Sequence, residues 1–342
     1  MSTARHAKVT LTNVSSKKHK DYSDYLKSFT YTDVYGDASD SFSADFDNKA
    51  MKYMSAWMPK KGNKFTASVL LSNWMEDGKN QKLKFGKFVL DDFSLSGRPL
   101  ACTISAVSTP SSSAFSTKQR TKTWKKITIK QIAKKIAKRY KLSLVYDAEK
   151  ITIKSIEQKD ETDSSFLNSL CKDYGIAMKI FNSKLVIYSE ARYEKKKAIL
   201  SISEKDMLSW SYNDTVSGTY SGAKYSYQDP KKNKTIKVKV GKGSRWLTAQ
   251  GEAGSKADAQ KKAYAAVNNS NKDMTTIQFE IMANPKMIAT ACIKITGLKN
   301  INGKYFVTKV THNIGSRYTM SVEARKVQQR LPKKKKKKKK KK

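Results

Sequence analysis

The sequence predicts a mostly β protein of the α+β class, in which two β blocks flank a small α/β insert. Apolar and polar residues alternate through 1–107 and again through 198–330, as they do in half-buried strands, whereas 125–197 contains two apolar stripes at helical spacing. The 342 residues are enough for about two domains. The two β blocks are similar in size and could be two copies of one barrel-like unit, although the letters show no direct repeat.

The first β block, 1–107, is expected to be an N-terminal domain. Its apolar segment 65–74 (FTASVLLSNW) is followed by the turn signal Asp77-Gly78. A later strand presents one apolar face, which consists of Cys102, Ile104 and Ala106. The serine-rich stretch 108–124 that follows is expected to be a loop or linker.

The insert, 125–197, begins with a strongly basic helix. Thr128 and Gln131 have the spacing of a capping box, which satisfies the first free N–H groups of a helix. The apolar stripe that follows consists of Ile129, Ile132, Ala133, Ile136, Ala137 and Tyr140. A DNA-recognition helix needs a second helix beside it, and a membrane-surface helix carries larger apolar residues. Because a strand follows and the stripe is mainly Ile and Ala, we expect this helix to pack on that strand with its lysines in solvent.

A second helix follows in the insert. Thr162 or Asp163 could cap its start, and Gly175 stands at the position just past its end. Its apolar stripe consists of Phe166, Leu167, Leu170, Cys171 and Tyr174. Capping explains the acidic residues at the helix start, and a metal role stays open. The residues after this helix predict a hairpin that turns at Asn182-Ser183.

The second β block, 198–330, is expected to contain one helix among its strands. Ser255 is placed to cap that helix, whose inner face consists of Ala259, Ala263, Tyr264 and Val267. Asn302-Gly303 between two alternating strands is the strongest short signal for a hairpin. The chain ends in 331–342, a lysine tail that we expect to be disordered because its charges repel one another.

The net charge of +40 is the most unusual property of the composition. Ten of these charges lie in Lys333–Lys342, so the remainder of the chain carries +30. Such a surface attracts polyanions in a salt-dependent manner. Only nine of the 69 basic residues are arginine, however, and arginine is the residue suited to reading phosphates and base edges. Solvated lysine decoration is the favoured interpretation, and a functional polyanion surface is the alternative.

The sequence predicts no catalytic, cofactor-binding or metal-binding site. Among the three histidines, His6, His19 and His312, only the last lies in a predicted strand, with Phe306, Val310 and Ile314 on the same face, as a core histidine would. The three cysteines are far apart with apolar neighbours, which favours buried free thiols; they are Cys102, Cys171 and Cys292. The glycine-rich segment Val240–Gly254 lacks the spacing of a P-loop, so a flexible loop is expected there.

The N-terminal stretch has no apolar core of a signal peptide, and no run approaches the ~18 apolar residues of a membrane span. We therefore expect a soluble chain that is synthesised in the cytoplasm.

Two stretches of the sequence resemble phage late control protein D, the family of baseplate hubs of contractile tails. In the first stretch, 120–190, the matching residues are Trp124, Thr128, Gln158 to Asp163, Phe166-Leu167, Leu170 and Tyr174-Gly175. In the second, 275–327, they are Gly297, Asn302-Gly303, Tyr305, Val310, His312 and Tyr318. The stretches occur in the family's order and spacing. The first 60 or so residues match only loosely, and the lysine tail is no family feature, so nothing carries over to either.

The resemblance implies a non-enzymatic structural protein that forms a homotrimer. Each chain would contribute two tube-like β-barrel domains, so that three chains present six similar units to the tail tube protein and a three-fold face to the central spike protein. The tape-measure protein and other baseplate proteins are further candidate partners, in a phage virion or a tail-like particle. Edge strands that pair across subunits would then close the ring.

Two other functions compete with this one. A basic nucleic-acid-binding protein is the alternative, because the chain carries +30 even without its tail. A cell-wall hydrolase is disfavoured, because the sequence offers no catalytic constellation for it.

Overall fold

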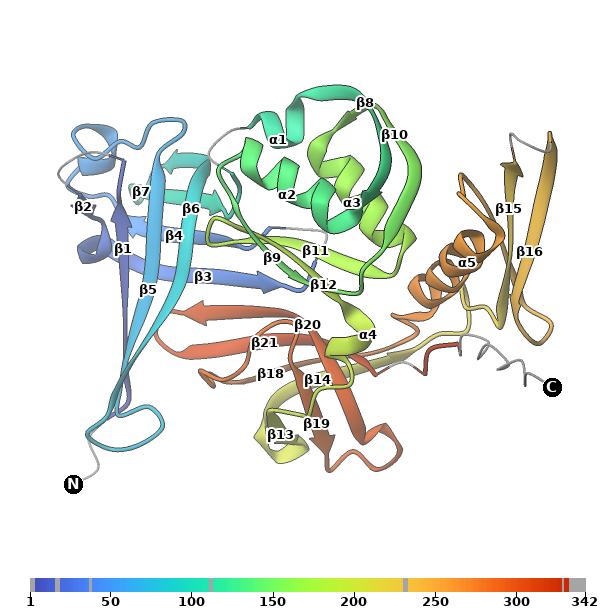
Figure 1. The fold of residues 1–342 in the computed structure, drawn as a ribbon. Coiled ribbons are helices and arrows are strands. Elements are labelled where there is room, and N and C mark those ends of the chain that lie inside the picture. Colours follow the sequence, from blue (N-terminus) through green and yellow to red (C-terminus); the bar gives the residue numbers. More distant parts are fainter. Residues whose placement is uncertain are drawn as a thin grey trace.

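The computed structural model describes residues 4–15, 19–36, 39–110, 113–229, 233–327 and 329–331. It contains one large sheet, the α/β insert packed against it, and a small projecting unit of three strands and a helix (Figure 1). The expected α+β class with mostly β content is confirmed. The lysine tail, Lys333–Lys342, lies outside the described residues.

The large sheet takes strands from both β blocks. The first block supplies β1 (His6–Asn13), β2 (Lys20–Asp21), β3 (Leu26–Val34), β4 (Ser41–Asp47), β5 (Lys64–Ser72), β6 (Asn80–Ser96) and β7 (Ala101–Val107). The second supplies β13 (Leu200–Ser203), β14 (Met207–Asp214), β18 (Thr275–Met282), β19 (Cys292–Thr296), β20 (Gly303–Ile314) and β21 (Tyr318–Lys326). Four short 3-10 turns lie between them, namely η1 (Ser23–Tyr25), η2 (Lys52–Met54), η3 (Glu204–Asp206) and η4 (Lys299–Ile301). The strand order is β14-β18-β21-β20-β3-β4-β7-β6-β5-β1-β2, and β19 pairs with both β20 and β13.

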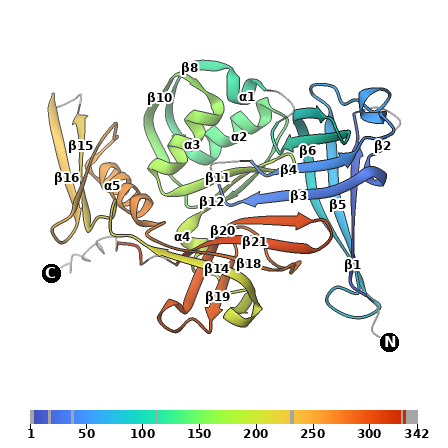
Figure 2. The same ribbon diagram turned by 180° about the vertical axis from the view of Figure 1, so that it is seen from behind.

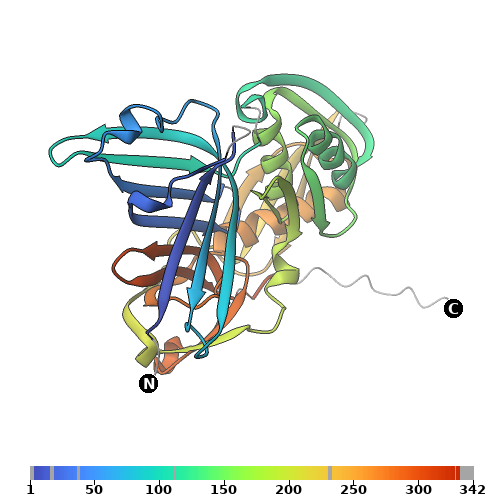
Figure 3. The ribbon, with the colours of Figure 1, turned by 90° about the vertical axis from the view of Figure 1, so that its left-hand side faces the viewer.

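The two closed barrels expected from the sequence are not seen in the described residues. Antiparallel pairing of β20 with β3 joins the blocks into one 13-stranded sheet, and no described sheet is closed. Apolar alternation identifies strands and their buried faces, but it does not say which strand lies beside which. Figure 3 shows the curved sheet from the side of the first block, with the blue and cyan strands in front.

The core of the large sheet is rich in aromatic side chains. Its buried phenylalanines and tyrosines include Tyr22, Phe29, Tyr31, Phe42, Phe46, Phe65, Phe85 and Phe88. The predicted apolar face of β7 is confirmed, since Cys102, Ile104 and Ala106 are all buried. The hairpin at Asn302-Gly303 is confirmed as the connection of β19 to β20. The three cysteines are free and buried, as predicted.

The insert is built from α1 (Ala114–Thr117), β8 (Gln119–Thr128), α2 (Ile129–Arg139), β9 (Ser143–Asp147), β10 (Thr152–Thr162), α3 (Asp163–Asp173), β11 (Ile176–Phe181), β12 (Lys184–Ser189) and α4 (Glu190–Tyr193). β8 pairs with β10, and β12 lies between β11 and β9. The stretch 108–124, expected as a loop or linker, thus contains α1 and part of β8. Phe115 and Trp124 explain this difference, because both are buried in the core of the insert and order the chain around them.

The basic helix α2 holds the insert together, as the sequence predicts. Thr128 and Gln131 form the capping box: the Gln131 N–H donates to Thr128 Oγ1 (3.2 Å) and the Thr128 N–H donates to Gln131 Oε1 (2.9 Å). The Ile and Ala residues of its stripe are buried, and its lysines are exposed. At the start of α3, Thr162 is the residue that caps, because its Oγ1 accepts a hydrogen bond from the Ser165 N–H (3.1 Å).

Asp163, the last residue of the run 158–163, is fully buried at the centre of the insert. Its carboxylate accepts hydrogen bonds from Tyr140 Oη (2.6 Å) and Gln158 Nε2 (3.0 Å). It also forms ion pairs with Arg120 (3.2 Å) and Arg139. Burial by itself raises the pKa of Asp163, but the hydrogen bonds from Tyr140, Gln158 and Arg139 outweigh burial and hold that pKa below its ordinary value. Ion pairing within the insert therefore explains this acidic residue.

The projecting unit contains β15 (Gly222–Asp229), β16 (Lys234–Gly241), β17 (Trp246–Gln250) and α5 (Lys256–Asn271). Figure 2 shows it at the far end of the molecule from β1. Ser255 caps α5, as predicted. The glycine-rich segment Val240–Gly254 is more ordered than the expected flexible loop, because it contains β17, which pairs with β15. Among the described residues, no helix has the length and apolar character needed to cross a membrane.

We expect the substitution Asp163→Ala to lower the free energy of unfolding by about 2–3 kcal/mol, because it leaves two arginines and two polar side chains without their shared acceptor. Urea denaturation followed by circular dichroism measures the change. The matched control is Thr162→Ala, which removes only the helix cap and should cost about 1 kcal/mol. Equal losses in the two variants would show that Asp163 does no more than begin α3.

Candidate functional site

A buried ionic cluster attaches the insert to the large sheet. Arg325 on β21 is fully buried and contacts Glu190 (3.1 Å) at the start of α4 and Glu194 (2.7 Å) just after it. Arg330, in the segment after β21, contacts the same two carboxylates at 3.3 and 2.9 Å. The positions of α4, the last strand and the segment that follows it are therefore coupled, because buried charges are tolerated only when they are paired.

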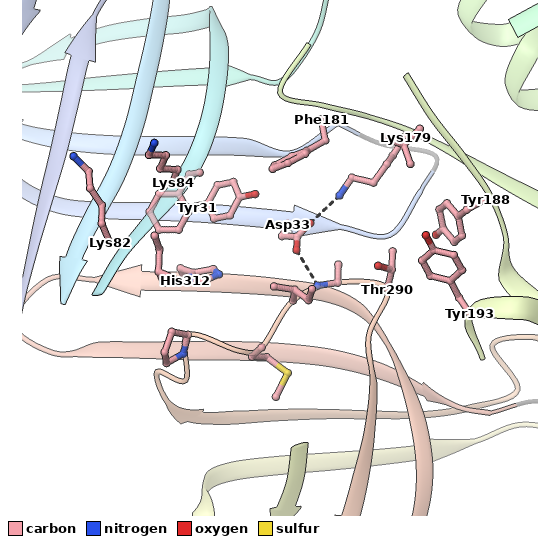
Figure 4. A pocket seen from close by; sticks show the side chains of 17 residues that line it. Tyr31, Asp33, Lys82, Lys84, Lys179, Phe181, Tyr188, Tyr193, Thr290 and His312 are labelled. Atoms are coloured by element: carbon pink, nitrogen blue, oxygen red, sulfur yellow. Dashed lines mark hydrogen bonds and ion pairs between the residues drawn. The ribbon is translucent and has the colours of Figure 1, made fainter. Parts of the chain in front are cut away.

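A second buried ionic group lies where β11 of the insert meets β3. Lys179 Nζ is 2.8 Å from Asp33 Oδ1 and 3.2 Å from Asp40 Oδ1, and it donates to the Val34 carbonyl oxygen. The other oxygen of Asp33 accepts a hydrogen bond from the Ala289 N–H (2.8 Å), as Figure 4 shows. Asp33 thus connects three segments that are far apart in the sequence.

The charges in this group shift one another's pKa. Burial raises the pKa of Asp40 to about 6, although Lys179 opposes the shift. Burial also disfavours the charged form of Lys179, but the two carboxylates outweigh it and raise the pKa of the amine. Lys179 therefore stays charged at neutral pH.

A cavity of about 390 Å³ opens beside Lys179, between the insert and the large sheet. Tyr31, Phe85 and His312 line it from the sheet, and Phe181, Tyr188 and Tyr193 line it from the insert (Figure 4). Lys82 and Lys84 on β6 also line it. The remaining lining is mainly aromatic and aliphatic, and Asp33 is the acidic residue among the lining side chains. Among the described residues, no group of three or more His, Cys, Asp or Glu side chains could hold a metal ion.

His312 is a core residue of the large sheet. Its Nδ1 shares a hydrogen bond of 2.6 Å with Tyr318 Oη, and burial lowers the pKa of His312 to about 4, so the ring is neutral at pH 7. It shares its face with Val310 and Ile314, as predicted. The expectation that Phe306 shares that face is wrong. A bulge between Val307 and Lys309 shifts the alternation, so Phe306 packs in a different cluster.

The large sheet ends in an open edge at β14. Among the described strands, β14 pairs only with β18. Trp210 lies opposite the buried Phe279, so it stands on the apolar face of the sheet, yet it is 42% exposed. Leu208 beside it is 54% exposed. At the other end of the sheet, β1 pairs with β5 along its length but with β2 only at Thr12 and Asn13. Along this strand order the sheet therefore has unfilled edges at both ends, and the edge at β14 carries large apolar side chains.

Sequence reasoning missed these features for different reasons. The pairing of Lys179 with Asp33 links residues 146 positions apart, and no local pattern marks such a contact. The open edge was implied by the resemblance, but the strand that forms it was not identified. The exposure of Leu208 and Trp210 follows only from the position of β14 in the strand order.

We expect Lys179→Met to lower the free energy of unfolding by about 3–5 kcal/mol at pH 7, because it leaves the buried carboxylates of Asp33 and Asp40 without their cation. The loss should be smaller at pH 4.5. The pKa of Asp40 is raised in the folded protein, so Asp40 destabilises the folded state as it loses its proton with rising pH. Without Lys179 this pKa rises further. At pH 4.5 the carboxyl group of Asp40 is therefore protonated in the variant, and its burial without a cation costs less.

Urea denaturation at the two pH values checks this expectation. The control is Lys184→Met, which removes an exposed lysine from the neighbouring strand β12 and should change stability little at either pH. If Lys179→Met lost the same stability at pH 7 and at pH 4.5, the loss would not come from unpaired carboxylates.

Known proteins share both sequence and fold with this chain. The family model described as phage tail baseplate hub (GPD) matches residues 90–318. A probable baseplate hub protein of Escherichia phage 186 is 29% identical over 167 residues, which are 48% of this chain and 40% of the phage protein. The chain thus matches less than half the length of that relative.

Three solved structures share the fold at low sequence identity. A tail protein of Neisseria meningitidis MC58 superposes with a TM-score of 0.71 at 11% identity, covering 94% of this chain and 96% of that one. The 43 kDa tail protein of prophage MuSo2 from Shewanella oneidensis superposes with a TM-score of 0.69 at 14% identity, covering 94% of this chain and 97% of that one. An E. coli component of the type VI secretion system superposes with a TM-score of 0.58 at 12% identity, covering 96% of this chain and 78% of that one. That protein is described as structurally similar to the T4 tail proteins gp27 and gp5. Since the family model spans well over half of the sequence, including β20 and the whole insert, the chain belongs to the phage tail baseplate hub family.

Proposed function

We propose that this chain is the structural hub of a contractile tail baseplate, assembled as a homotrimeric ring that adapts a six-fold tail tube to a three-fold central spike. The observation that carries the proposal is the open edge at β14. A strand whose apolar face ends in the exposed side chains of Leu208 and Trp210 is suited to pairing with another chain.

The unfilled edges at β14 and at β1 favour a ring over a two-fold dimer. β14 and β1 are different surfaces at opposite ends of the strand order. Pairing of β14 in one copy with β1 in the next is a head-to-tail contact, which produces a closed ring when the rotation between copies closes. The backbone supplies the hydrogen bonds, and Trp210 is then buried by the neighbouring copy.

Pairing between adjacent copies of the chain also accounts for the tube-like units that the family resemblance implies. Each β block contributes a curved half of the sheet, and the halves meet at the pairing of β3 with β20. In the proposed ring, strands from adjacent copies complete each half. Three chains then present six similar units to the tail tube protein, while the three-fold face binds the central spike protein.

The hub role places the chain at the baseplate of a virion or of a tail-like particle. Its partners are further copies of itself, the tube and spike proteins, and neighbouring baseplate proteins, including the tape-measure protein. Binding is the whole of the proposed activity: the contacts require shape and exposed backbone rather than chemical groups that turn over a substrate.

We expect the purified chain to elute with about three times its mass of 38.6 kDa in size-exclusion chromatography with light scattering. The double substitution Leu208→Glu and Trp210→Glu should raise the dissociation constant of the trimer at least about 30-fold, because it places charge in a buried apolar contact.

The matched control places the same two charges on β9 of the insert by replacing Ser143 and Val145, which are both exposed, with glutamate. The control variant should remain trimeric. Circular dichroism confirms that both variants fold. A monomeric wild-type chain that binds neither tube nor spike protein would overturn the proposal, and equal dissociation in the two variants would overturn the choice of β14.

A further inference from the structure

The projecting unit has one face covered by α5 and one face open to solvent. The covered face of its sheet is apolar and includes Ala223, Tyr225, Val238 and Val240. Because side chains alternate along a strand, the intervening residues point away from α5. In Figure 1 this outward side faces away from the rest of the molecule.

Along the described strands of this unit, lysines are the only charged residues on the outward side. Lys224 on β15 is directly opposite Lys239 on β16, and Lys237 lies two residues before Lys239. All three are exposed. The other outward residues of the described strands are uncharged; they are Gly222, Ser226, Gln228, Thr235, Gly241, Trp246, Thr248 and Gln250. Like charges directly opposite one another destabilise a sheet. We call this surface the lysine face.

Trp246 lies flat on the lysine face. A Cβ atom at Gly222 would fall 2.5 Å from the indole ring, so only glycine leaves room for the ring to lie across β15. Lys239 Nζ stands 4.1 Å from the ring centroid. The indole face is therefore covered by a single exposed, flexible cation rather than by the protein core, and a flat ligand can displace it.

A cavity of about 610 Å³ adjoins the lysine face at the end of β16. Lys239 and Trp246 line it together with Lys242, Lys261 and Tyr264, and Gly241 and Gly243 form part of its wall. None of its lining residues is acidic. The lysine face and this cavity therefore form one continuous positive surface with two aromatic rings.

We propose that the lysine face and the adjoining cavity bind single-stranded nucleic acid. The sheet places the backbone positions of these three lysines within about 5–8 Å of one another along and across its strands, a spacing that suits successive phosphates of one backbone. Trp246 and Tyr264 supply rings on which bases stack, the arrangement by which sheets hold single strands without reading their sequence. When a base stacks on Trp246, it displaces Lys239 from the ring and leaves that ammonium group free to pair with a phosphate. A rigid duplex keeps its bases stacked on each other, so the rings favour a single strand.

The test is fluorescence anisotropy of the full chain with a labelled 20-nucleotide oligo-dT at 50 and 200 mM salt. The triple variant Lys224→Gln, Lys237→Gln, Lys239→Gln should bind at least about tenfold more weakly at 50 mM salt, and the slope of log affinity against log salt should fall by about 2. Trp246→Leu should weaken binding about fivefold or more.

The matched control is Lys130→Gln, Lys134→Gln, Lys138→Gln, which removes the same charge from the exposed face of α2. It keeps the lysine tail, so any binding by the tail is common to both variants. The triple substitution on the lysine face removes only exposed like charges, so it should leave the unit folded, as circular dichroism will show.

The proposal stands if the lysine-face variant loses affinity and the α2 variant does not. It is overturned if both triple variants weaken binding equally, since diffuse charge then explains the affinity. It is also overturned if poly(glycerol phosphate) or duplex DNA competes as well as oligo-dT while Trp246→Leu has no effect. Neither result depends on the oligomeric state of the hub.

Discussion

The antiparallel pairing of β3 with β20 is the constraint on which the rest of the structure depends. It joins strands that are separated by more than half of the chain, and it makes one sheet from two blocks. Both buried ionic groups lie beside it. Asp33 is on β3 itself and holds Lys179 of the insert, whereas Arg325 on β21, the neighbour of β20, holds Glu190 and Glu194. The insert is thus anchored on both sides of the junction.

Charged anchors make the position of the insert specific. Apolar surfaces stabilise contact but tolerate small shifts, whereas a buried carboxylate that loses its cation costs several kcal/mol. Glu190 and Glu194 are buried, and both form ion pairs with Arg325 and Arg330. Asp33, which holds Lys179, also accepts a hydrogen bond from the Ala289 N–H. A displacement of the insert would break these contacts together. In a protein whose proposed work is mechanical fit, a single geometry of sheet and insert is what the partners require.

Local patterns predicted local structure well. Three predictions that depend only on residues close together in the sequence are confirmed: the capping box of Thr128, the apolar stripe of α2 and the Asn302-Gly303 hairpin. The failures involve distance or register. A bulge after Val307 moved Phe306 to another cluster, and Phe115 and Trp124 ordered a stretch whose serines favoured a loop. Lys239 and Trp246 lie on one face of the projecting unit because β15 pairs with both β16 and β17, and no local pattern of the sequence marks that arrangement.

The high positive charge and the open edge at β14 act on association in opposite ways. Net charge opposes the approach of identical chains at long range, and this repulsion is screened over about 8–10 Å at ordinary ionic strength. Backbone pairing acts only at contact and only between strands in register. Repulsion therefore disfavours the many unspecific contacts of Leu208 and Trp210, while an edge that meets its complement gains a full ladder of hydrogen bonds in addition to apolar burial.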